Sequence, residues 1–167
     1  GNYLRYTAKP IKEKMNLLEK SQKKELKEMV RENTKPFTKK SGIIQFPWEV
    51  LKNGEGGLSA VEKGVKVSEA DPKIRSVGYG GYPDRDGIVT LDACIMDKNS
   101  NCGSVSFLQN IKHPISVARH VMEDTPHVML SGKGALDFAV SKGFNQEDLL
   151  TDESRKDWLK WKENSNY

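Results

Sequence analysis

Residues 75–87 gather several side chains and backbone features that could take part in chemistry. Ser76 offers a hydroxyl, and glycines at positions 78, 80, 81 and 87 would let the backbone come close to a ligand or to another segment. The composition favours a tight loop that enters a strand over a ligand-binding loop. Because the stretch does not follow a strand and open a helix, it is not a dinucleotide-binding fingerprint.

The carboxylates in and after this loop are interpreted as structural. Asp84 and Asp86 flank Arg85, and nothing close to them in the sequence would raise the pKa of one carboxyl above that of the other, as acid–base catalysis needs. We therefore predict a turn that satisfies these side chains. Asp92 lies inside a predicted strand and would need hydrogen-bond donors if it were buried, so structural pairing is expected there too.

Histidine and cysteine show no catalytic or metal-binding spacing. No cysteine or serine motif accompanies the three histidines, which are therefore also predicted to be structural: His113, His120 and His127. Seven residues separate Cys94 from Cys102, and this spacing does not match a zinc site. We predict free thiols, because cross-strand positions rarely offer disulfide geometry. No metal and no cofactor is expected.

Alternating helices and strands are predicted to position these residues. Apolar spacing and helix-breaking residues predict helices over 48–53, 58–69, 114–122, 132–141 and from 151 onward. Alternation predicts a β-hairpin of residues 88–96 and 103–108, followed by a short buried strand over 127–130. In the helix over 132–141 the side chains expected to face inward are Leu136, Phe138, Ala139 and Val140. A sheet this small needs more strands or a second layer, so we expect an incomplete domain.

Length, composition and charge limit the classes of protein that fit. The chain has 167 residues, 36% hydrophobic and 30% charged, and no apolar run approaches the ~20 residues that cross a bilayer. Lys and Arg exceed Asp and Glu by seven within residues 1–40 and fall three short within 41–167. We predict a basic N-terminal extension over 1–34, helical or partly disordered, and a domain part over 35–167. Glutamates interspersed among the lysines, without aromatic residues between them, argue against nucleic-acid or membrane binding.

Seven stretches of the sequence carry a resemblance to a known family. They are AVEKGV (60–65), DP (71–72), RSVGYGG (75–81), PDRDG (83–87), TLDACIMD (90–97), IKHPISVAR (111–119) and TPHVML (125–130). In this order they closely resemble the α-subunit of the glycosylasparaginases, also called aspartylglucosaminidases. The resemblance runs from about Trp48 to about Trp161, and several long words in a fixed order are far more specific than one short motif.

This resemblance implies an α/β (α+β) fold, the four-layer αββα sandwich of the N-terminal-nucleophile hydrolases, of which this chain would be the α-subunit part. In that family a precursor cleaves itself before a threonine, which then opens the β-subunit and attacks the amide of N4-(β-N-acetylglucosaminyl)-L-asparagine, releasing aspartate and a glycosylamine. The free α-amine, with a pKa of about 7.7–8.0, can serve as general base for its own hydroxyl. The chain is thus expected to lack the nucleophile and to need a β-subunit from the same precursor. The family also suggests an (αβ)₂ assembly and a periplasmic or lysosomal address.

Two positions are singled out by the resemblance. Ser76 matches a family serine close to the nucleophile, where its hydroxyl could bond the threonine amine or hydroxyl, or could only satisfy a loop carbonyl. The family's α-subunit also opens with a buried strand and a Ser-Thr-Trp word whose tryptophan lines the substrate pocket, and no such word precedes Trp48 here. Either Ile43–Phe46 is a displaced strand with Phe46 as a substitute aromatic, or this pocket wall is lost.

Two alternative functions remain open at this point. One is a plant-type L-asparaginase or isoaspartyl peptidase; in those enzymes the segment equivalent to Ser68–Gly78 wraps a sodium ion, but we expect no metal here. The other is a catalytically weakened family member that acts as a binding or assembly protein, with an amphipathic basic helix over 10–32 docking a partner. The β-chain would distinguish these functions, since it carries the nucleophile.

Overall fold

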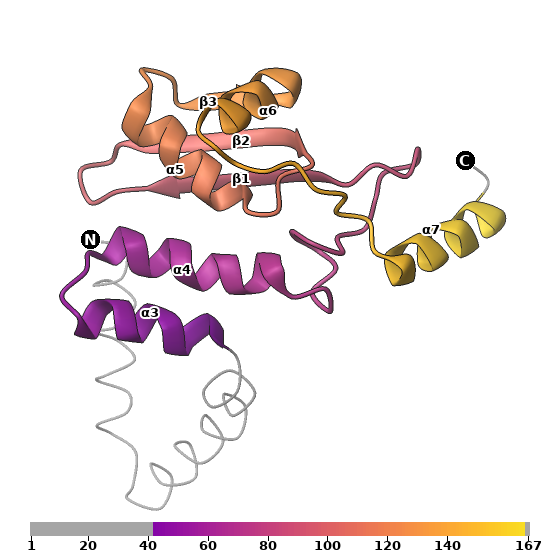
Figure 1. The fold of residues 1–167 in the computed structure, drawn as a ribbon, viewed down its shortest axis with the longest axis horizontal. Helices are drawn as coiled ribbons and strands as arrows, with labels where there is room; N and C mark the ends of the chain where they lie inside the picture. The colour runs from indigo at the N-terminus through magenta and orange to yellow at the C-terminus, as the bar shows by residue number, and fades with distance from the viewer. Residues whose placement is uncertain (1–41, 166–167) are drawn as a thin grey trace, which may run out of the picture. The chain divides into compact units, whose positions relative to one another are not determined.

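The computed structural model describes residues 42–165, and the predicted basic extension over 1–34 lies outside them. The elements, shown in Figure 1, are α3 (Gly42–Lys52), α4 (Gly57–Ala70), β1 (Thr90–Met96), β2 (Cys102–Gln109), α5 (Pro114–Asp124), β3 (Met129–Ser131), α6 (Gly132–Ser141) and α7 (Asp152–Asn164). The mixed α/β composition agrees with the expected fold class. Between residues 42 and 165 no helix is long and apolar enough to cross a membrane.

A three-stranded sheet in the order β1-β2-β3 forms the centre of this part of the chain. The predicted hairpin is confirmed: β1 and β2 pair antiparallel, with Met96 opposite Cys102 beside the turn. The backbone N–H groups of Asn99 and of Asn101 both donate to the Asp97 carboxylate and close that turn. The third strand pairs parallel with β2 but begins two residues later than predicted, and it is not buried, because only one of its edges is paired among the described residues.

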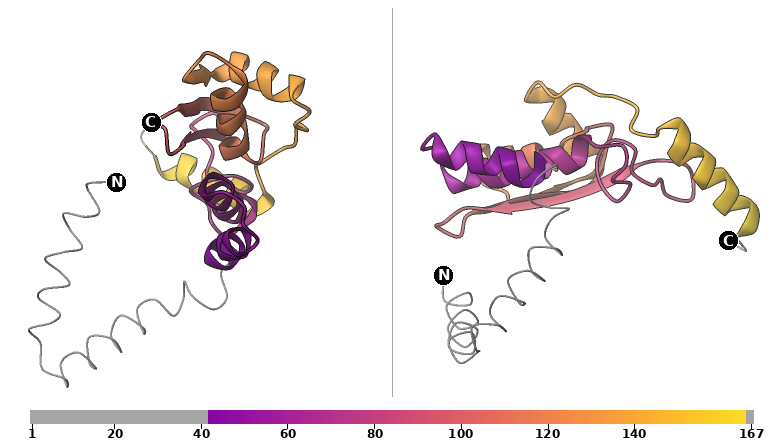
Figure 2. Two further views of the ribbon diagram at one scale, coloured as in Figure 1. Left: turned by 90° about the vertical axis from the view of Figure 1, so that its left-hand side faces the viewer. Right: turned by 90° about the horizontal axis from the view of Figure 1, so that it is seen from below.

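One face of the sheet carries the core. α5 packs on it with Val117, Ala118 and Val121 fully buried against Val105 and Leu108 of β2. Proline opens this helix, as predicted, because its fixed φ suits the first turn and its missing N–H costs nothing there. Figure 2 (right) shows α5 and α6 on one side of the sheet and α7 beyond the end of the strands, and the side chains that β1 turns to the other side, Asp92, Cys94 and Met96, are exposed.

The segment before Trp48 forms a helix in the structure. α3 begins at Gly42, six residues before the predicted helix, and continues through Phe46 and Pro47 to Lys52, so the alternative of a displaced strand at Ile43–Phe46 is wrong. The helix ends in a turn at Gly54 and packs beside α4, where Val50 is fully buried. A strand is stable only beside another strand, and these residues pair with none of the three described strands.

The last two helices, α6 and α7, lie where they were predicted, but the buried face of α6 differs in part from the prediction. α6 spans Gly132–Ser141, as predicted, but Ala135 and Ala139 are its buried residues, whereas Val140 is exposed. The prediction that Val140 faces inward is wrong. The face of α6 that packs against the sheet carries the small side chains of Ala135 and Ala139, which let the helix lie close to β2. The predicted N-cap of α7 is confirmed: the Ser154 N–H donates to Thr151 Oγ1 at 3.3 Å.

A half-buried ion pair joins α4 to α5 and should make stability depend on pH. Arg119 Nη1 donates to Glu62 Oε2 at 2.8 Å, and Ser116 Oγ donates to Glu62 Oε1 at 2.5 Å. Burial raises the pKa of the Glu62 carboxyl, but the hydrogen bonds from Ser116 and Arg119 outweigh that effect and hold the pKa below its ordinary value. Stability from this group is therefore present above its unfolded pKa of about 4.3 and is lost as the pH falls through its folded pKa.

Replacing Glu62 with glutamine should lower the free energy of unfolding by about 1 kcal/mol at pH 7, with the difference shrinking as the pH falls below about 4. Urea unfolding of both proteins between pH 3 and pH 7 measures it. Glu123→Gln is the matched control, because Glu123 bonds the same arginine from a more exposed position and should cost less. A difference that stays constant across this pH range would contradict the assignment.

Candidate functional site

The loop between α4 and β1 is held tightly by its own backbone. Tyr79 N donates to the Glu69 carbonyl at 2.7 Å, and Tyr82 N donates to the Arg75 carbonyl at 2.8 Å. Gly78 has φ +58°, and a Cβ added there would lie 2.0 Å from the Glu69 carbonyl oxygen. Only glycine fits this position, for both reasons. The interpretation of residues 75–87 as a tight loop that enters a strand is confirmed.

Glu69, which was not among the residues singled out from the sequence, is buried and only 1% exposed. Its Oε1 accepts from Ile115 N at 3.0 Å, and its Oε2 lies 3.0 Å from His113 Nδ1. The carboxylate thus caps the N-terminus of α5, where unpaired N–H groups and the helix dipole favour a negative charge. A weak signal was present, since His113 precedes the helix and provides no side-chain cap of its own. The backbone N–H groups that follow Pro114 in the first turn of α5 therefore need an acceptor from another element.

Ser76 lines a pocket of about 350 Å³ between this loop, β1 and the start of α5. The pocket is also lined by Glu69 of α4, by residues 90–94 of β1 and by Pro114 and Ile115 of α5. Ser76 is exposed, and within residues 42–165 its hydroxyl makes no hydrogen bond, so the reading in which it satisfies a loop carbonyl gains no support. A hydroxyl held on a rigid loop in an open pocket can donate to one group and accept from another.

The carboxylates of the loop and strand are structural, as predicted. Asp84 Oδ1 accepts from the backbone N–H groups of Asp86 and Ile88, each at 2.9 Å. Asp92 Oδ1 accepts from Phe107 N at 2.8 Å, at the irregularity where β2 has one residue more than β1. Phe107 has φ +52°, an unfavourable conformation for a residue with a side chain, and the bond from Asp92 helps to hold it.

The histidines and cysteines also have structural surroundings or free side chains. His113 pairs with Glu69, and His120 Nδ1 lies 2.8 Å from Asp124 Oδ2. Lys142 and His120 hold the pKa of the Asp124 carboxyl below its ordinary range. Cys94 and Cys102 are free and exposed, which confirms the prediction of free thiols. In the part of the chain that the structure describes, no three acidic, histidine or cysteine side chains converge on a point where they could hold a metal ion.

Phe46 and Ser76 line different pockets. Phe46, on α3, is 42% exposed and borders a shallow depression of about 430 Å³ with Lys63 and Lys66 of α4. The end of α4 lies between the two sites: Glu69 lines the pocket of Ser76, while Ala70 lines that of Phe46. The structure therefore does not bring the two predicted site residues together within one cavity.

Several known proteins are similar to this chain over most of its length. A relative from Elizabethkingia miricola, named N(4)-(Beta-N-acetylglucosaminyl)-L-asparaginase, is 64% identical over 120 residues, covering 72% of this chain and 35% of that protein. A protein of the same name from Rattus norvegicus is 45% identical over 131 residues, covering 76% of this chain and 37% of that protein. A putative N(4)-(beta-N-acetylglucosaminyl)-L-asparaginase from Drosophila grimshawi is 46% identical, covering 71% of this chain and 31% of that protein.

The chain thus spans about a third of the length of the curated relatives it matches. A protein family described as Asparaginase matches it over residues 15–167, which is most of its length. The residues that line the pocket of Ser76 lie within this matched range. The chain belongs to the asparaginase family.

Proposed function

We propose that this chain is the α-subunit part of an amidohydrolase that cleaves N4-(β-N-acetylglucosaminyl)-L-asparagine. Water would split the amide to give aspartate and a glycosylamine. The nucleophile would be an N-terminal threonine on a β-subunit that autoproteolysis of the same precursor releases. The observation that carries the proposal is the 64% identity to a relative of that name, in the segment that builds the Ser76 pocket.

The four-layer αββα sandwich is part of the same proposal. The described sheet has a helix-covered face and an opposite face on which Asp92, Cys94 and Met96 are exposed. A second sheet from the β-subunit packing on this exposed face would complete the sandwich and bury the apolar part of it. The (αβ)₂ assembly is proposed by family resemblance.

In this arrangement Ser76 would contribute a hydrogen bond, since nothing around it activates its hydroxyl as a nucleophile. The loop holds Ser76 in place through the Tyr79–Glu69 and Tyr82–Arg75 backbone bonds. A fixed hydroxyl beside an N-terminal threonine could orient the amine that takes the proton from the threonine hydroxyl. Preorganisation of this kind reduces the entropy cost of reaching the reactive geometry.

Aspartate release by the complete purified gene product tests the proposal directly. The substrates are glycoasparagine, L-asparagine and a β-aspartyl dipeptide, supplied at equal concentrations. Preference for glycoasparagine supports the proposed function, whereas preference for L-asparagine or the dipeptide would favour the plant-type alternative. Self-cleavage without turnover of any of the three would favour a binding or assembly protein.

Ser76→Ala is expected to slow self-cleavage or turnover by the equivalent of about 1–3 kcal/mol without unfolding the protein, because one hydrogen bond at the reacting amine is lost. Single-turnover kinetics and the rate of precursor cleavage measure the effect. Ser141→Ala removes a serine hydroxyl that bonds only the Phe138 carbonyl of its own helix and serves as the control. Unchanged processing and kinetics in the Ser76 variant would leave the residue with a purely structural role.

Phe46→Ala should raise KM for glycoasparagine if this exposed aromatic replaces the missing tryptophan wall, because stacking and water exclusion would be lost. The expected change is about two- to tenfold, with little effect on kcat. Leu51→Ala, which also shortens an exposed apolar side chain on α3, is the control. An unchanged KM would mean that another side chain forms this wall.

A further inference from the structure

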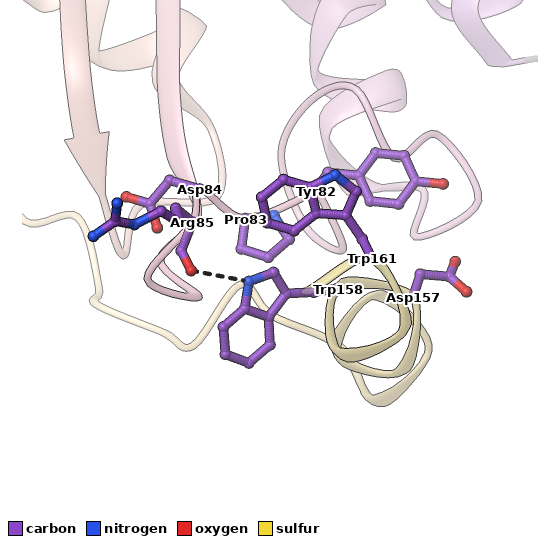
Figure 3. A pocket seen from close by; sticks show the side chains of 7 residues that line it. All are labelled: Tyr82, Pro83, Asp84, Arg85, Asp157, Trp158 and Trp161. Carbon is purple, nitrogen blue, oxygen red and sulfur yellow. Dashed lines mark hydrogen bonds between the residues drawn. The ribbon is translucent and has the colours of Figure 1, made fainter. Parts of the chain in front are cut away.

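A third pocket, of about 530 Å³, lies between residues 82–85 of the loop and α7. Figure 3 shows three aromatic side chains around it, Tyr82, Trp158 and Trp161, together with Asp84, Arg85 and Asp157. Tyr82 is 58% exposed and Trp161 is 46% exposed. Large aromatic side chains gathered in an accessible pocket are typical of a ligand site. A ligand that covers the rings removes apolar surface from water, which favours binding.

This aromatic pocket is built from the same loop that carries Ser76. Its Tyr82 donates its backbone N–H to the carbonyl of Arg75, the residue just before Ser76, at 2.8 Å. The Arg75 guanidinium in turn pairs with Asp157 on the pocket's other wall. Two walls of the pocket are thus tied to Arg75, the residue next to Ser76.

The pocket is held in a fixed shape by bonds that no part of the proposed reaction uses. Trp158 Nε1 donates to the Arg85 carbonyl at 3.3 Å. Ser154, which is fully buried, donates to the Gly80 carbonyl at 2.5 Å and anchors the first turn of α7 to the loop. Gly87 has φ +86°, and a Cβ added there would lie 3.0 Å from the Trp158 ring, so the loop approaches the indole as closely as glycine permits. A preformed site avoids the cost of ordering these side chains on binding.

The charges around the aromatic rings exclude some ligands and favour others. The protein already places Arg75 5.8 Å from the Tyr82 ring centre and Lys162 5.0 Å from that of Trp158, so these two rings are less open to a cationic ligand, while the Trp161 ring remains available for stacking. The Asp84 carboxylate disfavours an anion, whereas Asp157 is already paired with Arg75. A neutral ligand with an apolar face and hydroxyls that both donate and accept fits what remains: rings for the face, and Arg85, Asp84 and backbone groups for the hydroxyls.

We propose that this aromatic pocket is a saccharide subsite of the Ser76 site. The inference rests on the proposed function, because it assigns the pocket to the glycan of the substrate. The asparagine-linked sugar must lie beside the reacting amide, so the pocket further along the loop takes a later sugar of the chain. The ring of Trp161 is the platform on which that sugar stacks.

The test measures kcat/KM of the complete gene product for two substrates, in the wild type and in variants that lack one of two tryptophans. The kcat/KM for asparagine carrying N,N′-diacetylchitobiose is divided by that for asparagine carrying one N-acetylglucosamine. The ratio should be about three- to tenfold in the wild type and fall to about one in Trp161→Ala, because the stacking contact is lost. Trp48→Ala is the control, since Trp48 is similarly exposed, at 58%, but lies on α3 outside the pocket. Tyr82→Ala should reduce the ratio as well and replaces Trp161→Ala if that variant does not fold.

Direct binding separates failure of the subsite from failure of the proposed function. Free N,N′-diacetylchitobiose should change the tryptophan fluorescence of the wild type and of Trp48→Ala but not of Trp161→Ala, whether or not any amide is cleaved. Binding without cleavage would overturn the proposed function and keep the saccharide site. A ratio near one in the wild type, binding of choline in place of the sugar, or a Trp161 that acrylamide cannot quench because the complete protein covers it would each overturn the subsite.

Discussion

Gly78→Ala is expected to lower the free energy of unfolding by about 3 kcal/mol or more and, under the proposed function, to abolish self-cleavage. Two costs add at this position. The φ of +58° is unfavourable for any residue with a Cβ, and the added Cβ would lie 2.0 Å from the Glu69 carbonyl oxygen and 2.4 Å from its Cα. Backbone atoms cannot move aside as the end of a flexible side chain can. Relief of the clash would have to displace the loop that carries Ser76.

Gly54→Ala separates these two costs. Gly54 has φ +78°, yet nothing lies within 4 Å of a Cβ added there. The control should therefore show the conformational cost alone, about 1–2 kcal/mol. Urea unfolding of both variants, with the rate of precursor cleavage as second readout, gives the comparison. Equal losses of stability would mean that the loop moves away from Glu69 easily and does not hold Ser76 in a fixed place.

Glu69→Ala should cost about 3 kcal/mol, the second largest effect expected, because it removes a buried acceptor and leaves its donors without a partner. The Ile115 N–H at the start of α5 would lose its capping carboxylate, and His113 would lose its contact at 3.0 Å. A cavity the size of the side chain would remain beside the Ser76 pocket. Both thermal and urea unfolding measure the loss.

Glu69→Gln keeps the shape and one acceptor oxygen and so isolates the value of the negative charge at the helix N-terminus. It should cost about 1 kcal/mol, consistent with the usual interaction of a carboxylate with a helix dipole. Glu55→Ala removes an exposed carboxylate from the turn before α4 and should be nearly neutral. If Glu69→Ala were equally neutral, water would have to reach the N-terminus of α5 and replace the carboxylate.

Local signals in the sequence were enough for most elements. The hairpin followed from alternation on both sides of a turn closed by Asp97, and the start of α7 followed from Thr151, whose hydroxyl caps it. Pro114 correctly marked the first turn of α5. All of these depend on interactions between residues at most a few positions apart, so a single sequence contains them. The family followed from ordered motifs, which the similarity to known proteins confirms.

The site depended on contacts that no local pattern contains. Glu69 bonds His113 and Ile115, which lie 44 and 46 residues away in the chain, so its role as the cap of α5 is visible only once α4 and α5 are packed. Its periodicity alone marks it as one more polar residue near the end of a helix. The same holds for Trp158, whose indole bonds the Arg85 carbonyl across 73 residues.

By itself, then, the sequence determined most of the elements, the family and the identity of Ser76 as a candidate, because backbone propensities, caps and motif words are properties of neighbouring residues. Tertiary structure decided which faces are buried and which residues share a pocket. It buried Ala139 and exposed Val140, and it placed Ser76 and Phe46 in different pockets. Burial depends on how closely two elements approach, and that distance is set by side chains far apart in the chain, such as Gly103 of β2 against Ala118 of α5.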